Sequence, residues 1–182
     1  SHLPHPLRPG QLTLAQQAER RLRQRFCAVG LQEITTLSLT AADAADPDRI
    51  AISNPLLSET SHLRTSLWQE HLEVCRRNLQ ASQSGCWVFE IGHVFRPDGS
   101  AIEQNARLTG VIRGERRLSR WQTSGKPQPP AYHEARGLLA SVLESLGVEG
   151  QDRRLSDDGR LHPGRAATVV VEGRPLGCCG QL

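Results

Sequence analysis

The segment that most restricts the fold is residues 53–95, where a helical pattern leads directly into a strand pattern. Its helical part has apolar residues at i, i+4, i+7 and i+11, a spacing that places them on one side of a helix. Ser66, followed three residues later by Gln69, has the form of a capping box, so we expect the helix to begin there. The apolar residues on the expected buried side are Trp68, Leu72, Cys75 and Leu79.

A strand pattern follows Gly85. Apolar side chains recur at every second position from Trp87 to Ile91, the period of a β-strand. This alternation places Phe89 on one face and Glu90 on the other. A helix that feeds a strand in this way is expected to build part of the core.

The remaining elements follow from the same periodicities. Thr13 and Gln16 form a second possible capping box, for a helix over residues 13–29 that ends at Gly30. We expect Leu14, Ala18, Leu22 and Phe26 to share its buried face. A third helix is expected over residues 135–146, and strands over residues 32–39, 50–52, 107–113, 153–156, 167–171 and 176–179.

This order of elements predicts the fold class. Three helices are too few to cover a doubly wound parallel sheet, so we expect an α+β fold with an antiparallel sheet and the helices on one side. The proline-rich residues 1–11 are expected to be a linker from a preceding domain, with a single module over residues 12–182. The chain begins without methionine and ends directly after a strand pattern, so we expect it to be a piece of a longer protein.

The charge balance permits nucleic-acid contact without arguing for it, because 22 basic residues stand against 19 acidic ones. Four arginines between Arg20 and Arg25 form either a phosphate-facing surface or a solvated helix face, and we favour the second. The basic segment 114–130 around Trp121 either stacks a base or is a surface loop with an anchoring aromatic residue.

Motifs of known chemistry are absent from the sequence. There is no P-loop, no G-x-G-x-x-G, no H-E-x-x-H and no G-x-S-x-G. The five cysteines include no C-x-x-C pair, which argues against zinc and a disulfide framework and favours reduced thiols in a cytosolic protein. No apolar run is long enough to span a membrane, and no signal peptide is visible. Glu90 has the chemistry of a general base, but the sequence names no partner for it.

Several segments together resemble one family. They are NPLLSETSHLRTSL at 54–67, NL at 78–79, FEIGHVF at 89–95, LTGVIRG at 108–114, RGLL at 136–139, LHPGRAA at 161–167 and GCCGQL at 177–182. This ordered set resembles the catalytic-like module of the β subunit of bacterial phenylalanine–tRNA ligases, over roughly residues 3–182.

The resemblance implies a fold like that of class II aminoacyl-tRNA synthetases, an antiparallel sheet flanked by helices, without catalytic activity of its own. It also implies a cytoplasmic assembly of two α and two β subunits. In that assembly the α subunit binds ATP with Mg²⁺, phenylalanine and the 3′ end of tRNA, so we expect no cofactor and no metal in this chain.

The resemblance singles out residues that are expected to be structural or to lie at an interface, and none that is catalytic. They are Arg64, Thr65, Phe89, Glu90, His162 and Arg165. Arg96 and Asp98 echo the ATP-gripping arginine and acid of catalytic subunits, but the third-motif arginine has no counterpart, and we treat the echo as coincidence. The segment 131–137 departs from the family pattern, because it lacks the first acid and has Arg136 in place of lysine.

Two other functions are kept as alternatives. One is a stand-alone nucleic-acid-binding α+β domain, which rests on the arginine clusters. The other is a self-sufficient adenylate-forming enzyme, which phenylalanine-dependent ATP–pyrophosphate exchange by this chain alone would support.

Overall fold

The computed structural model describes residues 10–83, 85–114 and 132–182. Three α-helices are described, α1 (Leu14–Ala28), α2 (Trp68–Gln80) and α3 (Tyr132–Ser145), together with a short 3₁₀ helix, η1 (Ser58–Thr60). The strands are β1 (Gln32–Glu33), β2 (Leu39–Thr40), β3 (His62–Leu63), β4 (Gly85–Asp98), β5 (Ala101–Gly114), β6 (Gln151–Arg154), β7 (Ala166–Val171) and β8 (Arg174–Gly180). Most of the expected linker and the segment around Trp121 lie outside the described residues.

The strands form three sheets, ordered β1-β4-β5, β2-β3 and β6-β7-β8. All pairs are antiparallel except β1 with β4, which run parallel. A parallel pair requires a long connection between its strands. Here the connection contains the β2–β3 sheet, η1 and α2. The expected α+β class with antiparallel pairing is therefore confirmed, with one parallel pair added.

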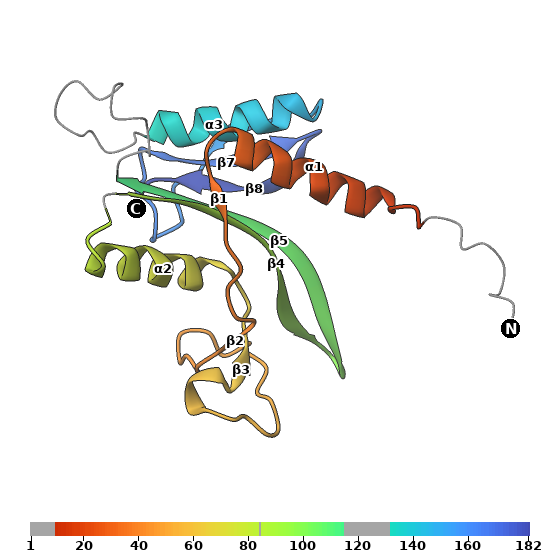
Figure 1. Cartoon of the computed structure of the whole chain (residues 1–182), viewed down its shortest axis with the longest axis vertical. Helices are drawn as coiled ribbons and strands as arrows, with labels where there is room; N and C mark the ends of the chain where they lie inside the picture. The colour runs from red at the N-terminus through yellow and green to blue at the C-terminus, as the bar shows by residue number, and fades with distance from the viewer. Residues whose placement is uncertain (1–9, 84, 115–131) are drawn as a thin grey trace, which may run out of the picture.

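The helices lie on both faces of the β1-β4-β5 sheet, so the expectation of helices on one side is wrong (Figure 1). On one face, Phe26 of α1 and Val142 of α3 pack with Trp87 and Phe89 of β4. The Phe26 and Phe89 rings stack with centroids 5.1 Å apart. On the other face, α2 packs against β4 through a smaller cluster of Cys75, Cys86 and Val88. Because strand residues alternate faces, β4 serves both cores.

The first helix begins as expected. Thr13 caps α1, accepting from the Gln16 amide at 3.2 Å while the Gln16 side chain accepts from the Thr13 amide at 2.9 Å. Of the four residues expected on its buried face, only Phe26 is buried, and Leu14 is strongly exposed. Figure 1 shows the reason, because the first turns of α1 project beyond the sheet.

The second helix differs from expectation in both its cap and its buried face. Its N-cap is Leu67, with no side-chain cap, so the expected Ser66–Gln69 capping box is wrong. Gln69 instead donates to the Asp43 carboxylate at 3.0 Å. The buried residues of α2 are His71 and Cys75, while Leu79 is exposed. Of the four residues of the predicted apolar stripe, only Cys75 is among the buried residues of α2.

The expected strand over residues 32–39 is interrupted between β1 and β2. The interruption coincides with Thr36 and Leu37, whose carbonyl oxygens each lie 3.3 Å from Arg64 Nη1. Between the two paired segments, residues 32–33 and 39–40, these carbonyls bond to the Arg64 side chain. The expected strand at residues 50–52 is reduced to a single bridge between Ala51 and His62.

The later elements follow the sequence pattern. Strand β5 pairs with β4 along its whole length, and Gly99 takes a positive φ of 59° in the turn that joins them. The hairpin β7–β8 turns through Glu172 and Gly173, both with positive φ. None of the described helices combines the length and apolar character needed to cross a bilayer.

Candidate functional site

The Arg64 guanidinium is the centre of a buried polar cluster between β4 and the segment that joins β1 to β2. Its Nη2 lies 3.0 Å from Glu90 Oε1, and the side chains of Arg64 and Glu90 are 4% and 2% exposed. Its Nε donates to the His93 carbonyl at 2.9 Å. Nη1 donates to Thr36 Oγ1 at 2.6 Å and to the two carbonyls described above. Every guanidinium nitrogen therefore has a protein partner.

Both carboxylate oxygens of Glu90 are also engaged. Oε1 accepts from Arg64, and Oε2 accepts from the Thr36 hydroxyl at 2.6 Å. A buried ion pair is tolerated only when its members are hydrogen-bonded in this way. Glu90 is thus a pairing carboxylate with no oxygen turned to an open cavity, and its general-base interpretation loses support.

Main-chain bonds fix Arg64 in place. Its amide donates to the Ser38 carbonyl at 3.0 Å, and its carbonyl accepts from the Phe95 amide at 2.9 Å. The segment that follows β3 is thereby attached to β4 on one side and to β2 on the other.

Thr65 is buried and belongs to a second polar network, which lies next to the first and involves the loop 41–49. Its hydroxyl donates to the Asp46 carboxylate, which also pairs with Arg49 at 3.1 Å. Arg49 is bound in addition to Asp43 at 3.3 Å and to the Gln69 amide oxygen. These contacts attach the loop to the start of α2.

His71 is a buried ionisable residue that the sequence did not single out. Its Nδ1 donates to the Leu67 carbonyl at 2.8 Å, while Nε2 has no hydrogen-bond partner among the described residues. Burial lowers the pKa of His71 from its usual value, and the nearby charges of Glu90 and Arg64 act in opposite directions on it. The ring is therefore held neutral beside the Arg64–Glu90 pair.

Phe89 serves the opposite face of β4. It has no exposed surface and packs with Phe26 and Val142. The adjacent residues Phe89 and Glu90 therefore lie on opposite faces of β4, Phe89 in a hydrophobic core and Glu90 in the polar cluster.

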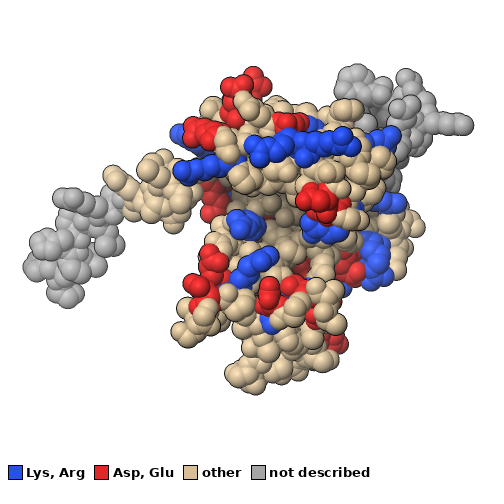
Figure 2. Space-filling view, turned by 180° about the vertical axis from the view of Figure 1, so that it is seen from behind, with Lys and Arg blue, Asp and Glu red and all other residues tan. Residues whose placement is uncertain are grey.

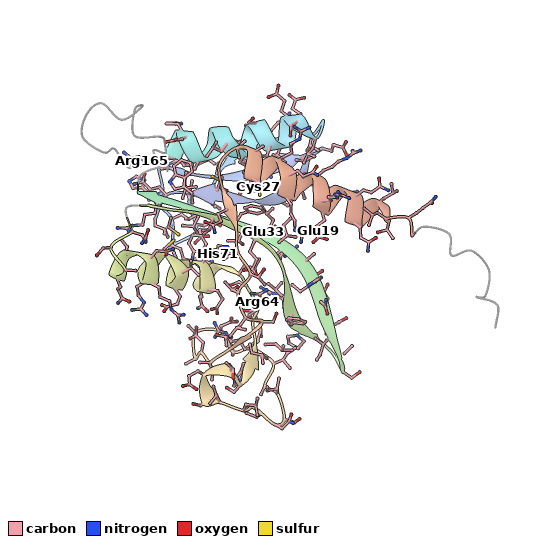
Figure 3. The ribbon with its side chains drawn as sticks, in the orientation of Figure 1. Glu19, Cys27, Glu33, Arg64, His71 and Arg165 are labelled. Atoms are coloured by element: carbon pink, nitrogen blue, oxygen red, sulfur yellow. The ribbon has the colours of Figure 1, made fainter. Side chains whose placement is uncertain are left out.

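His162 and Arg165 lie apart from this cluster. His162 Nδ1 accepts from the Gly164 amide at 3.1 Å, and Arg165 donates to the Gln181 side chain at 2.8 Å. Both residues are exposed, and Arg165 borders a hollow with Tyr132, His133 and Gln181. In Figure 3, Arg64 and His71 lie on the α2 side of β4, whereas Arg165 lies near the start of α3.

The structure thus brings together Arg64, Thr65 and Glu90 and adds Thr36 and His71 to them. The sequence gives neither added residue a distinctive signal. Thr36 lies within the expected strand 32–39, and His71 is next to Leu72 but does not belong to the predicted apolar stripe. No group of three or more metal-ligating side chains is found within residues 10–83, 85–114 and 132–182.

Comparison with known proteins supports the sequence resemblance. Residues 2–182 match the family model described as the phenylalanyl tRNA synthetase beta chain CLM domain. The chain belongs to this family.

Curated relatives agree over the whole chain. The phenylalanine–tRNA ligase β subunit of Parasynechococcus marenigrum (strain WH8102) is 66% identical over 182 residues, which are 100% of this chain and 22% of the relative. That of Prochlorococcus marinus (strain MIT 9313) is 58% identical over the same shares of the two chains. The chain therefore spans about a fifth of the relatives it matches.

A solved structure shows the fold. The pyrrolysyl-tRNA synthetase of Desulfitobacterium hafniense superposes with a TM-score of 0.57 at 13% identity, covering 86% of this chain and 52% of that one. The fold is therefore of the class II synthetase type, as the sequence predicted.

Arg136, where the sequence departs from the pattern expected for the phenylalanyl-tRNA synthetase β chain, has an intramolecular role. Its guanidinium binds both oxygens of Asp152 at 2.7 and 2.9 Å and the Gly150 carbonyl at 3.4 Å. It fastens the start of α3 to β6, and its side chain is largely buried. The charge at this position serves the internal packing of the module.

Proposed function

We propose that this chain is a non-catalytic structural module of the phenylalanine–tRNA ligase β subunit. In the proposed α2β2 enzyme it supports the α subunit, which binds ATP with Mg²⁺ and phenylalanine and charges tRNA in the cytoplasm. Membership of the β-chain family and the class II type of fold support this assignment.

The observation that carries the proposal is the closed Arg64–Glu90 cluster. A catalytic arginine or carboxylate must present free donor or acceptor atoms to its substrate. Here the guanidinium nitrogens and both carboxylate oxygens are bound to the protein itself. These residues therefore do not fit a nucleotide or metal site, and they stabilise the scaffold instead.

The exposed turn around His162 and Arg165 is the better candidate for an interface. The turn is held against the end of β8, because the His162 amide donates to the Gln181 carbonyl at 2.7 Å and the Gln181 amide donates to the Arg165 carbonyl at 2.9 Å. Arginine and tyrosine are both enriched in protein interfaces, and the exposed Arg165 lines a hollow together with Tyr132.

Co-expression with the cognate α subunit tests the proposal. We expect the full-length β chain to co-purify with the α subunit and the pair to catalyse phenylalanine-dependent ATP–pyrophosphate exchange. The isolated β chain is expected to catalyse none. Exchange by the β chain alone would overturn the proposal and favour the adenylate-forming alternative.

Two substitutions separate scaffold from interface. Arg165→Ala is expected to weaken co-purification with the α subunit while the unfolding midpoint stays unchanged. Arg64→Ala is expected to lower the midpoint itself. Altered affinity for ATP or phenylalanine in an otherwise intact Arg64→Ala assembly would contradict the structural role.

Nucleic-acid binding remains a second candidate because Arg20, Arg21 and Arg25 are exposed on α1, while Arg23 pairs with Glu19 and Glu33 at 2.5 Å. Figure 2 shows a band of basic side chains across the upper part of the back face, with acidic ones interspersed. Salt-dependent tRNA binding by this chain alone, lost when the three exposed arginines are replaced by glutamine, would favour this function. No binding at low salt would remove it.

A further inference from the structure

The contact between α2 and β4 brings two thiols together. Cys75 lies in the middle of α2, and Cys86 is the second residue of β4. Their Sγ atoms are 3.3 Å apart, and each residue is 5% exposed. The hydrophobic side chains packed against them are Ile34, Val74, Val88 and Val111.

The geometry is close to that of a cross-link. One thiol donates to the other sulfur, so the two side chains point toward each other. A disulfide bond is about 2.05 Å long, so the sulfurs need to approach by little more than about 1.2 Å. A shift of that size lies within the rotation of two cysteine side chains.

The surroundings distinguish the two sulfurs. Asn78 Nδ2 donates to Cys86 Sγ at 3.4 Å, and Arg113 lies opposite Cys86 in the β4–β5 ladder. Burial, followed by the neighbouring Cys86, raises the pKa of Cys75 to about 12. Cys75 is therefore a neutral thiol, whereas the Cys86 sulfur accepts a hydrogen bond from an amide.

We propose that Cys75 and Cys86 form a reversible disulfide when a hydroperoxide oxidises Cys86. The Cys86 thiol gives up its proton, and the thiolate sulfur attacks one peroxide oxygen. The O–O bond breaks to give a sulfenic acid, and with hydrogen peroxide as oxidant the leaving hydroxide takes up the proton released by Cys86 to form one water. The Cys75 sulfur then attacks the Cys86 sulfur. The S–S bond forms, the S–O bond breaks, and the hydroxyl leaves with the Cys75 proton as a second water. The two thiols lose two electrons, and the peroxide gains them.

Access to the buried pair requires the α2–β4 contact to open locally. Oxidation of the pair is therefore slower than that of the exposed Cys178. This order of reaction distinguishes a buried cross-link from indiscriminate surface oxidation.

The proposed disulfide links α2 to β4, close to the Arg64–Glu90 cluster. His71 lies one turn before Cys75 on α2, and Glu90 follows Cys86 and Val88 on the same face of β4. A bond between Cys75 and Cys86 closes a short loop and holds α2 on β4. We expect the oxidised protein to melt about 5 °C higher than the reduced one.

Peptide mapping tests the proposal in the full-length protein. The reduced protein is treated with hydrogen peroxide, its free thiols are alkylated under denaturing conditions, and the digest is analysed by mass spectrometry. We expect a Cys75–Cys86 linked peptide pair that disappears on reduction with dithiothreitol. Cys178→Ala should retain this pair, whereas Cys86→Ala should leave Cys75 alkylated.

Three results would overturn the proposal. In the first, both Cys75 and Cys86 are still alkylated after a peroxide exposure long enough to oxidise Cys178 fully. In the second, Cys86 is recovered as a sulfinic acid without a cross-link. In the third, either residue is linked to a different cysteine. The map of the unsubstituted protein decides between these outcomes, so a folding failure of Cys86→Ala leaves the test intact. The inference does not depend on the proposed function, because it requires no α subunit and no activity.

Discussion

Gly92 and Arg64 approach so closely that no side chain fits between them: a Cβ on Gly92 would stand 2.6 Å from Arg64 Nη2. The same Cβ would stand 2.7 Å from Glu90 Oε1 and 3.1 Å from Leu67 Cδ2. The absence of a side chain at Gly92 in β4 therefore leaves room for the ion pair.

Gly92→Ala should separate the Arg64–Glu90 pair or shift β4, because none of the three contacting atoms is a freely mobile chain end. We expect the free energy of unfolding to fall by about 3 kcal/mol. Urea denaturation measures this change. Gly177→Ala in β8 is the matched control, since its Cβ would meet nothing within 4 Å. Equal effects of the two substitutions would contradict the steric argument.

Arg64→Met and Glu90→Leu should each be strongly destabilising, because each leaves the other charge buried without its partner. We expect a loss of about 3–5 kcal/mol for each single variant and a much smaller loss for the double variant. A double-mutant cycle from urea denaturation measures the coupling. Additive losses would show that the two residues act independently.

The stability of the protein should depend on the charge of His71. Burial lowers its pKa in the folded state from the usual 6.5, so below that value the unfolded state binds more protons. The free energy of unfolding should therefore begin to fall as the pH drops below 6.5 and continue to fall down to the folded-state pKa. The slope from one such group is at most about 1.4 kcal/mol per pH unit.

Denaturation at a series of pH values checks this dependence. His71→Leu should flatten the curve between pH 7 and 5, a window of about two units around an ordinary histidine pKa. His93→Gln, which changes an exposed histidine of β4, should leave the dependence in place. A curve of unchanged slope in His71→Leu would assign the pH dependence to other groups.

Thr13→Ala should remove a working helix cap, whereas Ser66→Ala should remove none. Thr13 and Gln16 exchange side-chain bonds with each other's amides, but Ser66 makes no capping bond to α2. We expect a loss of about 1 kcal/mol for Thr13→Ala and a change near zero for Ser66→Ala. Thermal or urea denaturation distinguishes them, and a larger effect of Ser66→Ala would reverse the assignment.

The comparison of Thr13 with Ser66 also shows what a cap motif can predict. Both sequences have the required residue types at the required spacing. Around Thr13 the Gln16 side chain bonds to the Thr13 amide, and the box forms. Around Ser66 the loop 41–49 folds back, and Gln69 binds Asp43 and Arg49 instead. A local motif therefore holds only where no distant residue offers a better partner.

The apolar stripe of α2 was misplaced for a related reason. A sequence pattern ranks histidine among polar residues, so the predicted stripe includes Leu79 and leaves out His71. In the structure the Leu67 carbonyl accepts the Nδ1 hydrogen, which reduces the cost of burying the ring. Leu79 lies near the end of the helix and is exposed.

The sequence by itself determined the local elements and the family. Periodicity located the three described α-helices and the strands that pair as β4–β5 and β7–β8, because these elements depend on neighbouring residues. The ordered segments LRTSL, FEIGHVF and LHPGR identified the family, and Arg64, Glu90, His162 and Arg165 with it.

Only the tertiary structure decided which of those residues come together. Arg64 and Glu90 are 26 positions apart, and Thr36 is 54 positions from Glu90, so no local spacing predicts that they share one buried cluster. The Cys75–Cys86 contact and the interruption of the strand at Thr36 have the same origin. Each depends on packing α2 and the β1–β2 connection against one face of β4. That packing decides whether a buried charge or thiol has a partner, and so how much free energy its burial costs.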